Sequence, residues 1–296
     1  MVATPSSAVR RSALYVPCDK PRAMAKAETL ASDIIIFDLE DAVAPAVKAD
    51  AREALREHFR SYPDSPAERV VRINDLNTEW GSEDLMAARA CLPDSIALPK
   101  VDHASDIQLL RGALTETDAP ETLGIWIMAE TARGVLDIRD IISAAISETH
   151  PLNGLILGTN DLFNETGIGS LNPRSLAHPW LMQLVLAAKA FGITSLDGVY
   201  NDFQDETGFQ RECIEGSNMG FDGKTLIHPN QIDTANSVFS PSEGAVIEAQ
   251  KIVRAFAQPG HSDKGVISVD GKMVERLHLE QAKALLIKSE KIKARC

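Results

Sequence analysis

Four carboxylates stand out in this sequence because each ends or directly follows a short apolar run. Glu40 and Asp41 follow the run at 34–39, and Glu130 and Asp161 come after two later runs. Two such carboxylates, with room left for water and substrate oxygens, are ligands that suit Mg²⁺, so we predict Glu130 and Asp161 as the metal ligands. Glu40 or Asp41 would orient water bound to the metal. Each acid alone could equally cap the helix that follows it, but their clustering favours a metal site.

Three basic or titratable side chains end other apolar runs. Arg72 follows two valines, and could hold a substrate carboxylate through two hydrogen bonds or could pair with one of the acids. Lys100 could form a Schiff base, but we favour a lysine that balances the carboxylates, because a metal pair makes an imine redundant. His228 precedes a proline and could be a general base or could hold its loop in place, and we favour the second role slightly.

The beginning of the chain is locally basic. Arg22 and Lys26 lie four residues apart and therefore share one face of the first expected helix. A helix start that carries these charges could bind phosphate groups. The alternative is a solvated surface face, and from these two residues alone we favour that interpretation.

Short apolar runs and amphipathic stretches alternate along the chain. The expected strands lie at 12–17, 33–43, 68–74, 95–101, 123–131, 152–162, 193–200 and 221–229. The expected helices lie at 21–31, 48–59, 82–92, 104–117, 134–145, 178–192, 207–220 and 242–258. Eight strand–helix pairs in this order predict an α/β fold, the (β/α)8 TIM barrel, and a dinucleotide fold is disfavoured because no G-x-G-x-x-G follows the first strand. The residues named above would then meet at the carboxyl ends of the strands, where barrel enzymes place their active sites.

The pattern changes after residue 258. We therefore expect a barrel domain at 1–258, and a C-terminal loop and helix at 259–296. The stretch 274–293 has the spacing of an amphipathic helix, and its apolar side must be buried on the barrel or on a neighbouring subunit.

Composition narrows the class of protein. Among 296 residues there are 30 basic and 42 acidic side chains, a net charge of −12, and no basic stripe that would predict nucleic-acid binding. The four cysteines are scattered, which predicts neither a disulfide framework nor a zinc site and is typical of a reducing compartment. The first residues lack the apolar core of a secretory signal, and no run is long enough for a membrane span. We expect a soluble, cytoplasmic protein.

Nine short motifs recur in order along nearly the whole chain. They are RSALYVPCDKPRAMAKA (11–27), IIIFDLEDAV (34–43), VVRIN (70–74), ALPKV (97–101), IMAET (127–131), GTNDL (158–162), LDGVYNDFQD (196–205), GKTLIHPNQI (223–232) and VDGKMVE (269–275). With these motifs the chain resembles the citrate lyase β-subunit-like family of the aldolase/citrate lyase superfamily.

The resemblance implies a barrel, usually a trimer, that uses Mg²⁺ and acts on thioesters of CoA or of an acyl carrier. By motif, Glu130 and Asp161 look like the metal ligands, and Arg72 like the substrate contact. Arg22 and Lys26 look like contacts to the CoA phosphates. The expected activity is a lyase that cleaves or forms a carbon–carbon bond in a 3-hydroxyacyl thioester, with a 2-oxo acid and an acyl-CoA as products. Thioester hydrolysis on the same site is the alternative.

One position departs from the family pattern. Many active relatives carry an aspartate after the GKM motif, on a segment that enters a neighbouring subunit's site, and this chain has Glu275 there. Glu275 joins Arg72, Glu40 and Asp41 in the predicted catalytic set, although its longer side chain shifts the carboxylate by about 1 Å. GTNDL also has Thr159 and Asn160 where relatives often have alanine and glutamate. A non-catalytic CoA-binding subunit and a metal-free aldolase that uses Lys100 remain alternatives.

Overall fold

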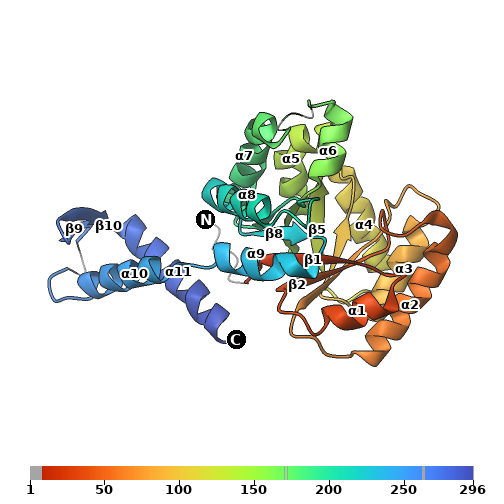
Figure 1. Cartoon of the computed structure of the whole chain (residues 1–296), viewed down its shortest axis with the longest axis horizontal. Coiled ribbons are helices and arrows are strands. Elements are labelled where there is room, and N and C mark those ends of the chain that lie inside the picture. Colours follow the sequence, from red (N-terminus) through yellow and green to blue (C-terminus); the bar gives the residue numbers. More distant parts are fainter. Residues whose placement is uncertain (1–8, 170, 172, 262–263, 296) are drawn as a thin grey trace. The chain divides into compact units, whose positions relative to one another are not determined.

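The computed structural model of the chain describes residues 9–169, 171, 173–261 and 264–295. Two compact units divide these residues: Arg10–Asn236 forms the first, and the second contains Val9 and the chain from Ser237 onward. The division lies earlier than the boundary expected at 258. The helix expected at 242–258 to close the barrel therefore belongs to the C-terminal unit (Figure 1).

Eight parallel strands close into a barrel in the first unit. They are β1 (Ser12–Pro17), β2 (Ile34–Asp38), β3 (Glu68–Arg72), β4 (Ser95–Leu98), β5 (Gly124–Ala129), β6 (Leu152–Leu157), β7 (Thr194–Asp197) and β8 (Gly223–Leu226). Each strand pairs with the next in sequence, and β8 pairs with β1. The predicted (β/α)8 barrel is confirmed, with helices between its strands (Figure 1).

The barrel helices fit the expected rhythm, with two differences. They are α1 (Pro21–Ala27), α2 (Lys48–Ser61), α3 (Gly81–Cys91), α4 (Ala104–Glu116), α5 (Ala132–Ala145), α6 (Thr159–Thr166), α7 (Pro173–Phe191), α8 (Glu206–Met219) and α9 (Ile232–Val238), with 3₁₀ turns at Pro45–Val47 and Pro229–Gln231. The strand expected at 152–162 ends at Leu157, because the polar residues after Gly158 begin α6. Helix α7 starts before the predicted residue 178 and contains Pro179.

Alternation along each strand sorts the side chains into layers inside the barrel. The middle layer is apolar and buried: Ala13, Ile34, Ile36, Val70, Ala97, Trp126, Met128, Ile156 and Leu196. At the amino ends of the strands, Arg10 pairs with Glu68 at 2.6 Å. Residues two positions further along β2 and β3 than the middle layer, Asp38 and Arg72, lie at the carboxyl ends. The apolar layer therefore forms the floor beneath the polar groups of the barrel mouth.

The C-terminal unit contains α10 (Glu243–Phe256), β9 (Val266–Val269), β10 (Lys272–Glu275) and α11 (Arg276–Lys293). Strands β9 and β10 form an antiparallel hairpin in a segment that we expected to be a loop. Asp270 and Gly271 both have positive φ, at 49° and 78°, as a tight two-residue hairpin turn requires. Phe256, Ile267, Val269, Val274 and Leu279 form a small core in this unit.

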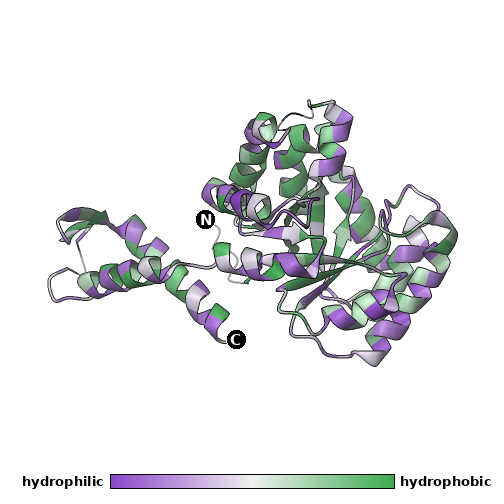
Figure 2. Ribbon diagram, in the orientation of Figure 1, coloured by the Kyte–Doolittle hydropathy of each residue, from purple (hydrophilic) through white to green (hydrophobic). Residues whose placement is uncertain are grey.

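Hydropathy follows this architecture. Figure 2 shows apolar residues concentrated in the barrel strands, and polar residues alternating with apolar ones along the surrounding helices. None of the helices in the described part of the chain is both long and apolar enough to cross a membrane.

Candidate functional site

Arg72 is held at the mouth by Asp38, which lies opposite it on the neighbouring strand. Its Nε and Nη2 donate to the two carboxylate oxygens of Asp38 at 2.7 and 2.6 Å. Asp38 is fully buried and also accepts the backbone N–H groups of Glu40 and Ala42. The structural pairing of Arg72 is therefore present, and it fixes the guanidinium in one orientation. Asp38 was missing from the predicted set, although its inward position after Ile34 and Ile36 could have indicated it.

Glu40 lies between the two basic side chains of the mouth. Arg72 Nη1 is 2.9 Å from Glu40 Oε2, and Lys100 Nζ donates to Glu40 Oε1 at 2.7 Å. Asp41 is half exposed and more distant, with its Oδ2 3.7 Å from Arg72 Nη1. Burial raises the pKa of Glu40 despite the opposing charges of Arg72 and Lys100. The structure thus brings Glu40, Asp41 and Arg72 together as predicted.

Lys100 also makes a backbone contact. Its φ of 50° is in the left-handed region, and its N–H donates to Glu130 Oε1 at 2.7 Å. Burial lowers the pKa of the Lys100 side chain, but its hydrogen bond to Glu40 and the nearby acids outweigh burial, and the pKa is raised. A Schiff-base lysine needs the opposite shift, so this site disfavours the aldolase alternative.

Glu130 has one held oxygen and one free oxygen. The side chain is 1 % exposed, and among the described residues its Oε2 has no hydrogen-bond partner. Gly158 packs directly against it, because a Cβ at that position would lie 2.3 Å from both Cβ and Oε2 of Glu130. Burial raises the pKa of Glu130 to about 8, and the charges of Glu40 and Asp161 add to the increase. A buried carboxylate oxygen without a partner is what a bound cation would satisfy.

Asp161 lies in the first turn of α6, three residues after Gly158. Its charge acts on Glu130, which places the two predicted metal ligands in one electrostatic environment. The part of the chain that the structure describes contains no group of three or more His, Cys, Asp or Glu side chains arranged around one metal position. A Mg²⁺ ion here would therefore take two protein carboxylates, and water or substrate would supply its other oxygens.

The charges at the mouth favour a cation. Five carboxyl groups and two basic side chains gather at this end of the barrel: Asp38, Glu40, Asp41, Glu130, Asp161, Arg72 and Lys100. The acids outnumber the bases, and three of the acids, Asp38, Glu40 and Glu130, are buried, where unbalanced charge costs most. The residues present therefore fit a divalent cation.

The remaining predicted residues lie elsewhere. Arg22 and Lys26 are exposed on α1, as a phosphate-binding surface requires and as a plain solvated face would also show. Glu275 belongs to the C-terminal unit, where it precedes α11 and its N–H donates to His278 Nδ1. His228 holds its loop: its Nδ1 accepts the N–H of Asn230, and its ring stacks on Phe203.

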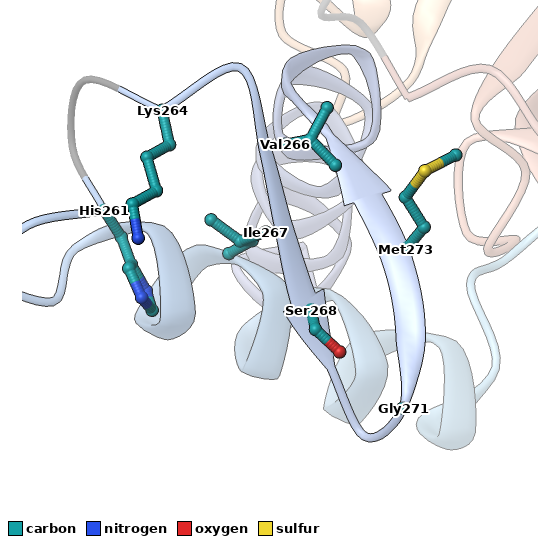
Figure 3. A pocket seen from close by; sticks show the side chains of 7 residues that line it. All are labelled: His261, Lys264, Val266, Ile267, Ser268, Gly271 and Met273. Carbon is teal, nitrogen blue, oxygen red and sulfur yellow. The ribbon is translucent and has the colours of Figure 1, made fainter.

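A separate cavity of about 570 Å³ lies in the C-terminal unit. Figure 3 shows its lining, with Lys264 and His261 on one side and Val266 and Met273 on the other. Among the described residues that line it, none carries a carboxylate, the ligand type that Mg²⁺ prefers. The barrel mouth remains the candidate active site.

Comparison with known proteins identifies the family of this chain. The sequence profile of the HpcH/HpaI aldolase/citrate lyase family matches residues 11–229. The chain belongs to this family. It is 43 % identical over 285 residues to a (3S)-malyl-CoA thioesterase of Cereibacter sphaeroides, with 96 % of each chain covered. It is also 31 % identical to the mitochondrial citramalyl-CoA lyase of Homo sapiens, with 96 % of this chain and 86 % of the relative covered.

Solved structures of family members show the same fold. The CitE protein of Mycobacterium tuberculosis, in complex with magnesium, acetoacetate and coenzyme A, matches with a TM-score of 0.77 at 31 % identity, covering 96 % of this chain and 100 % of that one. A citrate lyase β subunit from the same organism, complexed with oxaloacetate and magnesium, matches with a TM-score of 0.68 at 32 % identity, covering 79 % and 99 %. The family resemblance that the motifs predicted is confirmed.

Proposed function

We propose that this chain is a magnesium-dependent lyase that cleaves or forms the carbon–carbon bond of a 3-hydroxyacyl-CoA, with an acyl-CoA and a 2-oxo acid as products. The observation that carries the proposal is the unpartnered Oε2 of Glu130 beside the charge of Asp161. The relatives act on malyl-CoA or citramalyl-CoA, and solved neighbours hold magnesium with small oxo acids, which supports the same ligand classes here.

Each mouth residue has a role in this proposal. Glu130 and Asp161 would hold Mg²⁺, which when bound supplies Lewis-acid polarisation of substrate oxygens. Arg72 is held by Asp38 through Nε and Nη2, and its Nη1, which pairs with Glu40 Oε2 here, would turn to the negative charge of the substrate. Glu40 accepts a hydrogen bond from the ammonium group of Lys100, and the backbone N–H of Lys100 donates to Oε1 of Glu130. The site is thereby ordered before substrate arrives.

The bond changes in cleavage follow from the substrate. A base takes the proton of the 3-hydroxyl group, the oxygen forms a carbonyl, and the carbon–carbon bond breaks. Its electron pair passes to the carbon next to the thioester, and that carbon then takes a proton. We assign Glu275 of the C-terminal unit as the donor of this last proton. We assign Arg22 and Lys26 as the residues that bind the CoA phosphates. We also propose a homotrimer, in which Glu275 would reach the site of a neighbouring subunit.

Thioester hydrolysis on the same site is the second candidate. The observation that favours it is the 43 % identity to a (3S)-malyl-CoA thioesterase over almost the full chain. Hydrolysis would release free CoA and the hydroxy acid, whereas cleavage leaves the thioester intact on the acyl-CoA product.

One assay separates the two candidates. Malyl-CoA is incubated with the protein and Mg²⁺, and free thiol, malate and glyoxylate are measured. Glyoxylate without free thiol supports the lyase, and malate with an equal amount of thiol supports the thioesterase. If neither product forms from malyl-CoA or citramalyl-CoA, both proposals fail and the non-catalytic CoA-binding alternative gains support.

The metal assignment has its own test. Glu130→Gln keeps the size of the side chain but removes a metal oxygen, and we expect turnover to fall by at least about 100-fold. Glu165→Gln is the matched control, because Glu165 is an exposed carboxylate on the same helix as Asp161 and accepts the backbone N–H of Ala132. Undiminished turnover in Glu130→Gln would refute the assignment.

A further inference from the structure

Tyr15 projects into the barrel mouth directly below the carboxylates. It follows Ala13 of the buried middle layer by two positions on β1, so its side chain points to the same side of the strand. The guanidinium carbon of Arg72 lies 4.8 Å from the centre of its ring. Tyr15 is therefore packed beneath the one arginine that we assign to the substrate.

The hydroxyl of Tyr15 has only a weak partner. It donates to the sulfur of Met128 at 3.9 Å, and Arg72 Nη1 contacts the same sulfur at 3.8 Å. A thioether is a weak acceptor, so this contact does not satisfy a phenol. Tyr200 shows the contrast, because its hydroxyl donates to Asp205 Oδ2 at 2.7 Å. Within the described chain, the O–H of Tyr15 therefore remains available to donate to a stronger acceptor.

The surroundings keep Tyr15 protonated. Burial raises its pKa above the ordinary value, Arg72 opposes this increase, and the charges of Glu130, Asp38 and Glu40 add to it. A phenol with a raised pKa remains a neutral donor at physiological pH. It can thus donate to a negative oxygen without adding negative charge to a site that already holds the carboxyl groups of Asp38, Glu40 and Glu130.

We infer that the Tyr15 hydroxyl donates a hydrogen bond to a carboxylate or oxo oxygen of the 2-oxo acid that Arg72 binds. This inference rests on the proposed function and adds a substrate contact that the sequence did not indicate. On binding, the O–H leaves the Met128 sulfur for the oxygen of the acid. Tyr15 and Arg72 together then select small acids whose anionic end reaches the floor of the mouth.

Tyr15→Phe tests the inference because it removes only the hydroxyl and keeps the ring under Arg72. We expect the binding of oxaloacetate or pyruvate in saturating Mg²⁺, measured by calorimetry, to weaken on the order of 10-fold or more, as for a hydrogen bond to a charged group. The affinity for Mg²⁺ alone and the midpoint of urea unfolding should match wild type, which a merely structural role of the hydroxyl would not predict. Tyr62→Phe, at the end of α2, is the control and should bind the acid normally.

The pH dependence gives a second readout. Because Tyr15 stays protonated, the ratio of wild-type to Tyr15→Phe affinity should be the same at pH 6.5 and pH 8.5. If the two proteins differed in affinity only at pH 8.5, Tyr15 would be an acid–base group and the donor assignment would be overturned.

The outcomes also separate this inference from the proposed function. If wild type binds a 2-oxo acid and Tyr15→Phe binds it equally well, the inference is wrong and the proposed function stands. If binding depends on Tyr15 but no CoA thioester is turned over, the inference is supported and the proposed function is wrong. If wild type binds no 2-oxo acid with Mg²⁺, both are wrong.

Discussion

Two buried groups of charges in the barrel differ in one respect, and the difference separates a ligand site from a structural lock. The mouth cluster consists of Asp38, Glu40, Arg72, Lys100 and Glu130. The side cluster lies where β7 and β8 meet α7 and α8, and consists of Arg174, Asp197, Glu212, Glu215 and Lys224. In the mouth cluster, buried carboxylate oxygens remain without a hydrogen bond. Among the described residues, no buried side-chain atom of the side cluster lacks one.

The side cluster is closed by its own contacts. Lys224 is fully buried, and its Nζ donates to Asp197 Oδ2, Glu212 Oε1 and the carbonyl of Gly198, at 2.9, 2.7 and 2.6 Å. These three acceptors use all three protons of the ammonium group. Arg174 forms two more bonds to Asp197, at 3.0 and 2.9 Å. Nothing in this cluster requires a ligand.

The pKa shifts of two equally buried acids express the same difference. Burial raises the pKa of Asp197, but Lys224 and Arg174 outweigh burial and the net shift is downward. Burial also raises the pKa of Glu130, where Glu40 and Asp161 add to it and the value reaches about 8. Burial alone therefore does not mark a functional acid. The absence of a paired basic side chain distinguishes Glu130 from Asp197, and a cation is what Glu130 would accept.

The largest expected effect tests the closed cluster. Lys224→Met removes the ammonium and leaves Asp197 buried with less compensation, so we expect a loss of about 3–5 kcal/mol in the free energy of unfolding, measured in urea. Lys189→Met is the control, because its ion pair with Asp222 is partly exposed and should contribute less than about 1 kcal/mol. If the two variants were equally stable, the side cluster would not be a structural lock.

In the mouth cluster we expect a substitution to stabilise the fold instead of destabilising it. In metal-free buffer, burial raises the pKa of Glu130 to about 8, so the folded protein keeps a proton that the unfolded chain releases near the ordinary pKa of 4.5. The stability that this proton provides is present below that lower value and is lost as pH rises through 8. Glu130→Gln has no such loss, so its stability relative to wild type should increase on the order of 2 kcal/mol between pH 6 and pH 9.

Magnesium provides the control for this result. Adding Mg²⁺ should raise the unfolding midpoint of wild type and leave that of Glu130→Gln unchanged, because only the carboxylate binds the ion. A difference between the two proteins that did not vary with pH would show that Glu130 is not a buried, unbalanced acid.

The sequence predicted the barrel and most of the mouth for a common reason. Periodic apolar runs determine which residues end parallel strands, and strand ends meet at one edge, so Glu40, Arg72 and Glu130 could be brought together without coordinates. Pairing across space has no such local signal. The alternation along β2 indicates that Asp38 faces the mouth, but its pairing with Arg72 and the contacts of Lys224 depend on strand register and on helices distant in sequence.

Two other misses have separate physical causes. The hairpin β9–β10 is short. Its Asp270-Gly271 turn is typical of a hairpin, but the short strands on either side resemble a loop in sequence. The weak hydrogen bond of the Tyr15 hydroxyl to a sulfur could not be predicted, because a tyrosine in an apolar strand is ordinary until its neighbours are known. Backbone conformation was equally hidden at Lys100, which has a positive φ and donates its N–H to Glu130.

The smallest effect distinguishes the backbone of Lys100 from its side chain. Lys100→Gly and Lys100→Ala both remove the ion pair with Glu40, but glycine adopts a φ of 50° freely, whereas alanine is strained there. We therefore expect Lys100→Gly to be more stable than Lys100→Ala by about 1 kcal/mol and to bind Mg²⁺ more tightly, because it keeps the N–H aimed at Glu130 Oε1. Urea unfolding and calorimetric titration with Mg²⁺ measure the two differences. Equal metal affinity in both variants would mean that the amide of residue 100 does not position Glu130, and the order of the mouth cluster would then have to come from its side chains alone.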